Sequence, residues 1–372
     1  MQKSWISLGL MSGTSGDGVD ASIIRTNGIN QYELIKDKYF EYDLRIYKDI
    51  HNLKEKIHKI EHLKKYKDEI NNLERNITIF HAEIIKQLNI SENTLIGFHG
   101  QTIYHNPDEK ISRQLGNGKL LHQLTNRNIV FNFRKNDILK GGQGAPLTPV
   151  FHHLISIKNE IKLPVCFLNI GGISNITIVQ DRENLSELIS KDIGPGNCLI
   201  DSWVRKNSNK KFDQDGNLAL SGTKNEIIFE QAQELYANRN SKKKLSFDVN
   251  DFDISFVRGL SLQDGVATLT DFTASIIGEE LSLSLKEFKE NTLDILICGG
   301  GRKNKLLLKK IQDNTSSSYK LKLIDDYKIN GDFIESQAFA FLAIRSFQSL
   351  PISYPNTTGC NKPCLGGELI KN

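Results

Sequence analysis

The chain has 372 residues and carries 48 basic and 44 acidic side chains, which leaves a formal net charge of only +4. So small an excess predicts no nucleic-acid partner, and no segment approaches the roughly 18 apolar residues of a membrane span, so we expect no membrane association. With 38% hydrophobic and 25% charged residues the composition is that of a soluble globular protein, and the length predicts two domains.

The first apolar run is too short for a signal peptide and leads straight into glycines, so we expect a cytoplasmic location. Residues 4–10 and 19–26 enclose a loop rich in Gly, Ser and Thr, a pattern typical of a β-hairpin. The glycines let backbone N–H groups approach an anion, so the loop has the parts of a phosphate grip. Asp17 and Asp20 would repel a phosphate but suit Mg²⁺ held through water. A tight hairpin with capping hydroxyls is the alternative.

The next segment mixes strand and helix patterns. Residues 32–42 predict a strand, and apolar residues between Ile50 and Leu88 recur every three or four positions, which predicts one or two surface helices. A coiled-coil partner helix is disfavoured because the pattern is short and shows no consistent e/g charge code. Short strands over 95–98 and 129–133 precede a helix over 147–157. The loop Gly141–Pro146 is the expected crossing between the domains.

Two further glycine loops follow predicted strands in the second half. Val165–Ile170 leads into Gly171 and Gly172 and then a second strand, and Leu293–Cys298 leads into Gly299–Gly301 before a helix. Three glycines there let a phosphate or a flat ligand lie against the backbone at the helix start. Each loop is ambiguous alone, but three are hard to explain as turns. The two hairpins at corresponding places suggest a duplicated α/β unit.

Asp192 precedes the turn Gly194–Gly196 at the end of a predicted strand. A carboxylate held rigidly in this way suits a general base. A structural cap of a turn or helix is equally compatible with the pattern. Helices are expected from about residue 197, over 264–285, from about 303, and over 336–347.

The five cysteines are an odd number without a Cys-x-x-Cys pair, which predicts reduced thiols rather than a disulfide framework. Cys360 and Cys364 lie four apart. We interpret them as structural thiols and not as a metal site, because no second Cys/His pair completes four ligands. The histidines show no His-Glu-x-x-His pattern, so structural or substrate-contacting roles are favoured over metal ligation.

Taken in order, these motifs closely resemble the anhydro-N-acetylmuramic acid kinase family of the actin/Hsp70/sugar-kinase superfamily. The resemblance spans nearly the whole chain, and its specificity lies in the ordered set. The matching segments are Gly9–Ser15, Asp17–Asp20, Gly97–Thr102, Phe133–Arg134, Gly141–Leu147, Asn169–Asn175, Asp192 with Gly194–Asn197, Cys298–Gly301, Glu335 and Thr358–Gly359.

This resemblance implies an α/β, two-domain actin-like ATPase (ribonuclease H-like) fold with ATP and Mg²⁺ in an interdomain cleft. The first domain would be residues 1–140 completed by 346–372, and the second residues 141–345, carrying the catalytic Asp and the adenosine-binding loop. The family opens the 1,6-anhydro ring of anhydro-N-acetylmuramic acid with water and phosphorylates the freed 6-oxygen, in peptidoglycan recycling. A small-molecule sugar is thus the expected partner, with the chain as a homodimer.

Residue by residue, Asp192 matches the catalytic aspartate, and Asp17 is expected to hold Mg²⁺ through water. The expected sugar contacts are Thr102, Arg134, Asn175 and Glu335. The expected ATP contacts are Gly13, Thr14, Ser15, Gly16, Asp17, Gly18, Val19, Asp20, Gly171, Gly172, Gly299, Gly300 and Gly301.

Three positions depart from the family pattern, namely Gly16 in the phosphate loop, Asn132 before Phe133, and Ile193 after Asp192. These departures could change the affinity for the ligands but not the type of reaction. The alternatives are a kinase of another amino sugar and a non-catalytic sugar or nucleotide sensor on the same fold. The sensor is disfavoured because no helix-turn-helix domain precedes the core and Asp192 is present.

Overall fold

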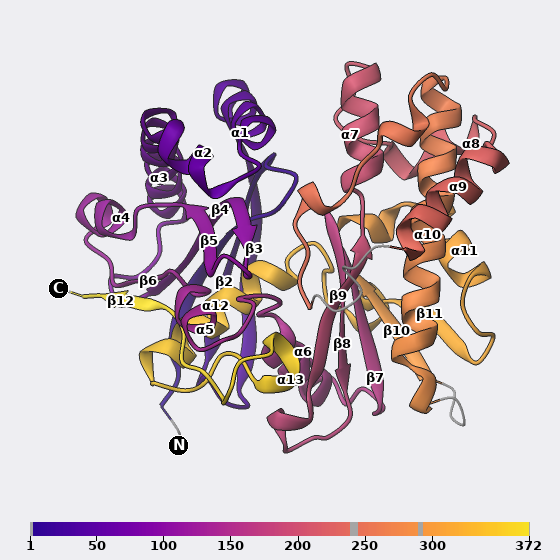
Figure 1. Cartoon of the computed structure of the whole chain (residues 1–372). Coiled ribbons are helices and arrows are strands. Elements are labelled where there is room, and N and C mark those ends of the chain that lie inside the picture. The colour runs from indigo at the N-terminus through magenta and orange to yellow at the C-terminus, as the bar shows by residue number, and fades with distance from the viewer. Residues whose placement is uncertain (1–2, 239–244, 289–292, 372) are drawn as a thin grey trace. The chain divides into compact units, whose positions relative to one another are not determined.

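The computed structural model describes residues 3–238, 245–288 and 293–371. The chain divides into two compact units, each with its own sheet (Figure 1). Unit 1 consists of the residues up to Leu163, Val179–Ser190, and the residues from Asp332 onward. Unit 2 consists of Pro164–Ile178 and Lys191–Gly331.

Unit 1 contains a seven-stranded mixed sheet in the order β12-β6-β4-β1-β2-β3, with β5 paired to β4. Strands β1 and β2 form the predicted antiparallel hairpin, β3 continues it at the sheet edge, and β4 lies parallel to β1 on the other side. The loop between β1 and β2 is therefore flanked by a neighbouring strand. The strand bounds are β1 Trp5–Ser12, β2 Gly18–Thr26, β3 Tyr32–Glu41, β4 Leu95–Asn106, β5 Ile111–Leu115, β6 Ile129–Phe131 and β12 Glu368–Ile370.

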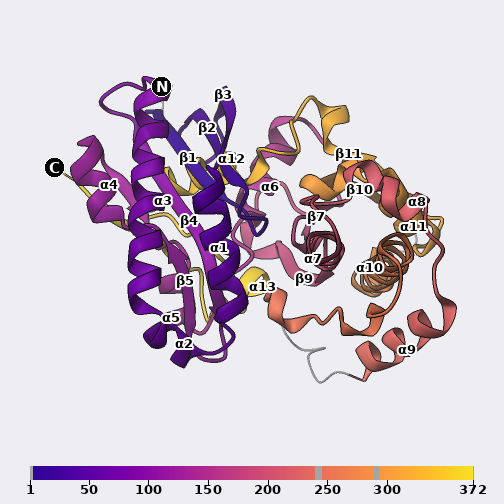
Figure 2. The ribbon, with the colours of Figure 1, turned by 90° about the horizontal axis from the view of Figure 1, so that it is seen from above.

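Successive residues of β1 face opposite sides of this sheet. Leu8 and Leu10 join the core formed with α1 (Leu44–Lys56) and α3 (Lys67–Leu88), while Gly9 faces α12 (Ile334–Phe347). Figure 2 shows α1 and α3 lying together over the sheet of this unit. An added Cβ at Gly9 would lie 1.9 Å from the Ser336 carbonyl oxygen, so only glycine lets α12 approach this closely. The remaining helices of this unit are α2 Ile60–Lys65, α4 Gly118–Thr125, α5 Lys135–Leu139, α6 Pro149–Lys158 and α13 Pro355–Thr358.

Unit 2 is built on a five-stranded sheet in the order β11-β10-β7-β8-β9, in which β7, β10 and β11 are parallel. Every residue of β7 is buried, as expected of a parallel strand covered on both faces. The strand bounds are β7 Val165–Ile170, β8 Ile173–Val179, β9 Ile189–Pro195, β10 Leu293–Cys298 and β11 Tyr319–Leu323. The helices are α7 Cys198–Asn207, α8 Asn217–Leu220, α9 Glu226–Ala237, α10 Leu262–Ser284 and α11 Lys305–Asp313.

The α/β class expected from the sequence is confirmed, and α1 and α3 bury apolar stripes against the sheet as surface helices do. The expected division of the chain differs from the observed units. The loop Gly141–Pro146 lies inside unit 1, because α6 after it packs against α12 and β3. Helix α12, expected in the second domain, also belongs to unit 1, because it packs against β1, β2 and β4.

A helix that crosses a bilayer needs about 20 predominantly apolar residues. Among the described residues, none of the helices combines the length and apolar character needed to cross a membrane.

Candidate functional site

The loop between β1 and β2 is a tight turn that the neighbouring strand β4 holds in place. The Gly16 N–H donates to the Gly13 carbonyl oxygen over 3.1 Å. Gln101 of β4 donates from Nε2 to the same oxygen over 2.9 Å and accepts at Oε1 from the Ser12 hydroxyl over 2.6 Å. One side chain thus fixes both the end of β1 and the first residue of the turn.

Gly13 and Gly16 in this loop have different surroundings, so glycine is present at each for a different structural reason. Gly16 has φ +63°, and an added Cβ would lie 2.8 Å from Ile50 Cγ2, so a larger residue is disfavoured by both backbone and packing. Backbone conformation and packing thus both account for a glycine at position 16. At Gly13 an added Cβ would meet only the Ser15 hydroxyl, at 4.0 Å, among the described atoms. The backbone at Gly13 is therefore open to a ligand, and Thr14 and Ser15 beside it are exposed.

Carboxylates gather around Asp20, two residues into β2. Burial and the neighbouring carboxylates raise the pKa of Asp20 to about 8. These neighbours, in order of effect, are Glu335, Asp17, Asp332 and Asp37. Mutual repulsion among buried carboxylates is relieved by a bound proton or by a cation, and carboxylate oxygens are the ligands that Mg²⁺ prefers.

The structure thus brings Asp17, Asp20 and Glu335 together, as three of the predicted site residues, and adds two that sequence reasoning missed. Asp37 reaches the cluster because β3 pairs with β2 in a register that sets it opposite Ser22, whose hydroxyl donates to it over 2.5 Å. Asp332 stands just before α12. The order of strands in the sheet, rather than any motif, would have been needed to find them.

Arg134, a predicted sugar contact, is fixed beside the same sheet. Its Nη2 donates to His99 Nε2 over 2.9 Å, and its Nη1 donates to the Gly144 carbonyl oxygen over 2.8 Å. Burial, with Arg134 next in effect, holds the pKa of His99 well below its usual range, so the imidazole is neutral and can accept. Thr102, also in unit 1, accepts from Gln114 Nε2 over 3.2 Å.

Asp192 lies in the middle of β9 and not at its end, because the strand continues to Pro195. Pro195 is compatible with the end of β9 because this strand lies at the edge of its sheet. The Asp192 N–H donates to the Leu245 carbonyl oxygen over 2.8 Å, and its Oδ2 accepts from the Phe247 N–H over 2.7 Å. The side chain is 8% exposed. The N-cap of α7 is Asn197 and has no side-chain cap bond, so Asp192 does not cap that helix. Its carboxylate is held by the Phe247 N–H, and its main chain is held by Leu245.

The glycine turns of unit 2 lie together at the ends of β7 and β10. These parallel strands pair Asn169 with Cys298, so the turns that follow are neighbours. An added Cβ at Gly299 would lie 2.4 Å from Asn169 Oδ1, and one at Gly301 would lie 2.2 Å from Ile170 Cγ2. One at Gly300 would meet no described heavy atom within 4 Å. Gly299 and Gly301 are set by packing, whereas Gly300 faces open space.

The first of these turns is also tied to the segment after Asp192. The Gly171 carbonyl oxygen accepts from the Asn197 N–H over 2.8 Å, and the Gly172 carbonyl oxygen accepts from the Gly196 N–H over 2.9 Å. Asn175, the predicted sugar contact of unit 2, has a buried Oδ1 without a hydrogen-bond partner in the described part of the chain. An orphaned buried acceptor of this kind suits a ligand donor.

Comparisons with known proteins agree along the whole chain. A family model described as anhydro-N-acetylmuramic acid kinase matches residues 5–372. The chain is 53% identical to the anhydro-N-acetylmuramic acid kinase of Pelagibacter ubique over 100% of both chains. It is 36% identical to that of Zymomonas mobilis, covering 98% of this chain and 99% of the relative. It is 32% identical to that of Agrobacterium fabrum, covering 98% of each.

Solved structures give only remote likenesses. The activator of the 2-hydroxyisocaproyl-CoA dehydratase from Clostridium difficile, with bound ADPNP, is 10% identical with a TM-score of 0.41, covering 92% of this chain and 96% of that one. Component A of the Acidaminococcus fermentans (R)-2-hydroxyglutaryl-CoA dehydratase is 12% identical with a TM-score of 0.43, covering 92% and 98%. The assignment rests on the sequence comparisons: the chain belongs to the anhydro-N-acetylmuramic acid kinase family.

Proposed function

We propose that this chain is an ATP-dependent kinase that opens the 1,6-anhydro ring of anhydro-N-acetylmuramic acid and phosphorylates its 6-oxygen. The product is N-acetylmuramic acid 6-phosphate, an intermediate of peptidoglycan recycling. The observation that carries the proposal is the 53% identity to a kinase of that name along the full length of both chains. We further expect a cytoplasmic homodimer, which light scattering and fractionation of cells would test.

Asp192 is the proposed general base. The Phe247 N–H bonds to Oδ2 and orients the carboxylate, while the bond from Asp192 N to Leu245 fixes the main chain, as a positioned base requires. It takes a proton from water, whose oxygen attacks the anomeric carbon. The bond between that carbon and the 6-oxygen breaks, and the 6-oxygen attacks the γ-phosphorus of ATP, with ADP leaving. Water thus supplies the new anomeric hydroxyl, and ATP supplies the phosphoryl group.

Open backbone at glycine turns supplies the proposed nucleotide contacts. In unit 1 these are Gly13–Asp20, with the exposed hydroxyls of Thr14 and Ser15. In unit 2 they are Gly171, Gly172 and Gly299–Gly301, where the open face of Gly300 leaves room for a flat ligand.

The carboxylates around Asp20 fit Mg²⁺, because they are hard oxygen donors whose mutual repulsion a cation relieves. Asp17 and Asp20 are the residues proposed to hold it, Asp17 through water. The ion would neutralise phosphate charge in the loose transition state of phosphoryl transfer.

Four polar side chains are proposed to bind the sugar. Arg134 offers a planar guanidinium already fixed by His99 and Gly144, which matches a carboxylate such as the lactyl group of the substrate. Asn175 brings the orphaned acceptor Oδ1. Thr102 and Glu335 complete the set with a hydroxyl and a carboxylate.

The reaction is tested with anhydro-N-acetylmuramic acid and Mg-ATP in ¹⁸O-water, with product analysed before the anomeric oxygen can exchange. We expect ¹⁸O at the anomeric position and phosphate on the 6-oxygen. Phosphorylated product without label would rule out attack by water. Turnover of a simple hexosamine, but not of the anhydro sugar, would favour another amino-sugar kinase. Binding of both ligands without turnover would favour a sensor.

A further inference from the structure

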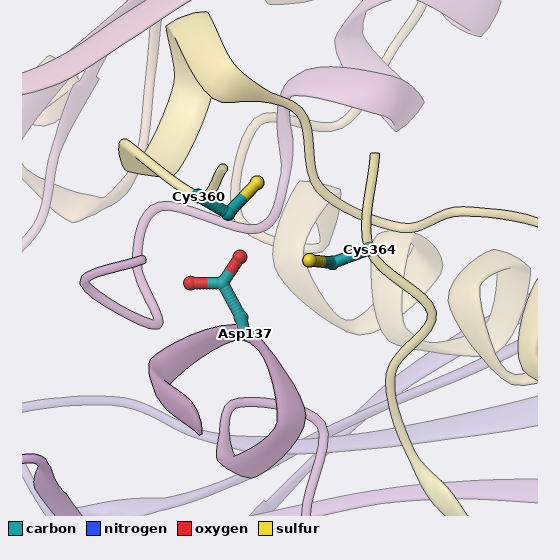
Figure 3. Close-up of side chains that lie close together, drawn as sticks. All are labelled: Asp137, Cys360 and Cys364. Atoms are coloured by element: carbon teal, nitrogen blue, oxygen red, sulfur yellow. The ribbon is translucent and has the colours of Figure 1, made fainter. Parts of the chain in front are cut away.

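Unit 1 contains a second cluster of ligand-type side chains, formed by Asp137, Cys360 and Cys364. Figure 3 shows Asp137 reaching from α5 toward the two cysteines, which come from the segment after α13. One carboxylate oxygen and the two sulfur atoms all lie within 4.8 Å of one another. The three side chains are 0%, 1% and 3% exposed, respectively. Residues far apart in sequence thus place one oxygen and two sulfur donors around one point.

Asp137 has a buried carboxyl group surrounded by neutral donors. Its Oδ2 accepts from the Gly144 N–H over 2.7 Å, and its Oδ1 accepts from the hydroxyls of Ser353 and Thr358 over 2.5 and 2.7 Å. Among the ion pairs of the described residues, none involves Asp137. A fully buried carboxylate without a cationic partner is incompletely compensated, so this place favours a positive ion.

The two thiols decide which kind of ion fits. Thiolate sulfur selects soft or borderline cations such as Zn²⁺ and is a poor ligand for Mg²⁺. Burial, with Cys360 beside it, raises the pKa of Cys364 to about 12, so without a metal the thiol keeps its proton. Metal binding would release both thiol protons to solvent. Loss of two thiol protons balances the two positive charges of the cation, so binding adds no net charge to the interior.

We propose that Asp137, Cys360 and Cys364 form a binding site for a thiophilic divalent cation such as Zn²⁺, separate from the Mg²⁺ site at Asp20. Two thiolates and one carboxylate supply three of the four tetrahedral positions, and water takes the fourth. Such a metal ties the C-terminal segment to α5 and to the loop at Gly144. Since Gly144 also accepts from Arg134, the bound ion stiffens the support of that guanidinium.

The test uses the reduced full-length protein, stripped by chelation and titrated with Co²⁺ in the absence of ATP. We expect one equivalent to bind with a thiolate-to-cobalt charge-transfer band in the near ultraviolet, and Zn²⁺ to displace it. Cys360→Ser and Cys364→Ser should each weaken binding by about 100-fold or more. Cys166→Ser, which alters a buried free thiol of unit 2, is the matched control and should bind like the wild type. Zn²⁺ should raise the melting temperature of wild type and control only.

Asp137→Asn keeps the shape of the side chain and should weaken cobalt binding without abolishing the charge-transfer band, since both thiolates remain. If that variant does not fold, the two cysteine variants still decide. Absence of the band in the wild type, or its persistence at full strength in both cysteine variants, would overturn the proposal. A disulfide between Cys360 and Cys364 on treatment with oxidised glutathione, with no cobalt uptake by the reduced protein, would also overturn it.

Discussion

The two glycine hairpins of this chain share a pattern but differ in chemistry. The hairpin of unit 1, at Gly13–Gly18, leads directly into the carboxylates around Asp20, and its turn is braced by the side chain of Gln101. The turn of unit 2, at Gly171–Gly172, is bound through main-chain carbonyl oxygens to the residues after Asp192. Carboxylates therefore surround the hairpin of unit 1, whereas the turn of unit 2 is joined to the main chain at Gly196 and Asn197.

This difference shows how one local motif can serve two tasks in a kinase. A strand–glycine–strand unit offers backbone donors in either setting. Next to the hairpin of unit 1, β3 adds the carboxylate of Asp37 to those around Asp20. The predictions that follow perturb one hairpin region at a time, so that each effect can be compared with its counterpart in the other unit.

The largest effect is expected at Asp192. Asp192→Asn keeps an oxygen to accept the Phe247 N–H but cannot take a proton from water, so kcat should fall by about 10²–10⁴-fold. Affinity for ATP, measured by calorimetry, should stay at the wild-type value because the phosphate loop is untouched. Asp313→Asn, on the exposed end of α11, serves as the matched control. A variant of Asp192 that retained most of its turnover would exclude the general-base role.

Asp20 should make Mg²⁺ binding depend on pH. Because its pKa is raised to about 8, a proton must leave before the cation binds, so Mg²⁺ affinity should rise about tenfold per pH unit up to pH 8. Without Mg²⁺, the free energy of unfolding should fall as pH rises, which is opposite in sign to the change in Mg²⁺ affinity. A raised carboxyl pKa contributes stability at low pH that is lost as pH rises from about 4 to 8.

Asp20→Asn separates these two effects. The variant should bind Mg²⁺ weakly at every pH, and its free energy of unfolding in chelator should lose most of the decline between pH 4 and 8. Denaturant titrations at several pH values, with and without Mg²⁺, measure both quantities. Wild-type Mg²⁺ affinity that did not change between pH 6 and 8 would contradict the proposed role of Asp20.

Much of the architecture could be predicted from local patterns. The buried run Val165–Ile170 and the hairpin around Gly13 were recognised because periodicity and turn residues act over a few positions. The extent of β9 could not be predicted in this way, because Gly194 and Pro195 are residues typical of a turn. At the edge of the sheet these two residues instead continue the strand past Asp192. Sheet position overrides the local signal there.

Residues that meet only through tertiary structure could not be predicted either, because no local sequence pattern shows which distant segments come together. Asp37 joins Asp20 through the register of β3 on β2, and Asp137 joins Cys360 through the return of the C-terminal segment to α5. The interpretation of Cys360 and Cys364 as structural thiols was made without Asp137, whose place beside them depends on the fold. Likewise the loop at Gly141 resembled a domain crossing because its glycines were visible, while the packing of α6 on α12 was not.

A smaller effect is expected from the glycines of the first hairpin. Gly16→Ala places a side chain at φ +63° and close to Ile50, and should lower the free energy of unfolding by about 1–2 kcal/mol. Gly13→Ala, with open space around it, should change stability by less than about 0.5 kcal/mol yet weaken ATP binding. Equal destabilisation by the two variants in urea titrations would contradict the distinction between packing and ligand glycines.

The distinction between packing glycines and ligand glycines also applies in unit 2, where the smallest effect is expected. Gly300→Ala adds a methyl group that meets no described atom within 4 Å, so stability should stay within about 0.5 kcal/mol of wild type. If the nucleotide lies against this backbone, ATP affinity should nevertheless fall by about tenfold, or 1.4 kcal/mol. Gly301→Ala, directed at Ile170, should instead lower the melting temperature. Unchanged ATP affinity in Gly300→Ala would mean that the open space at this turn is not where the nucleotide binds, leaving Gly171 and Gly172 as the contacts of unit 2.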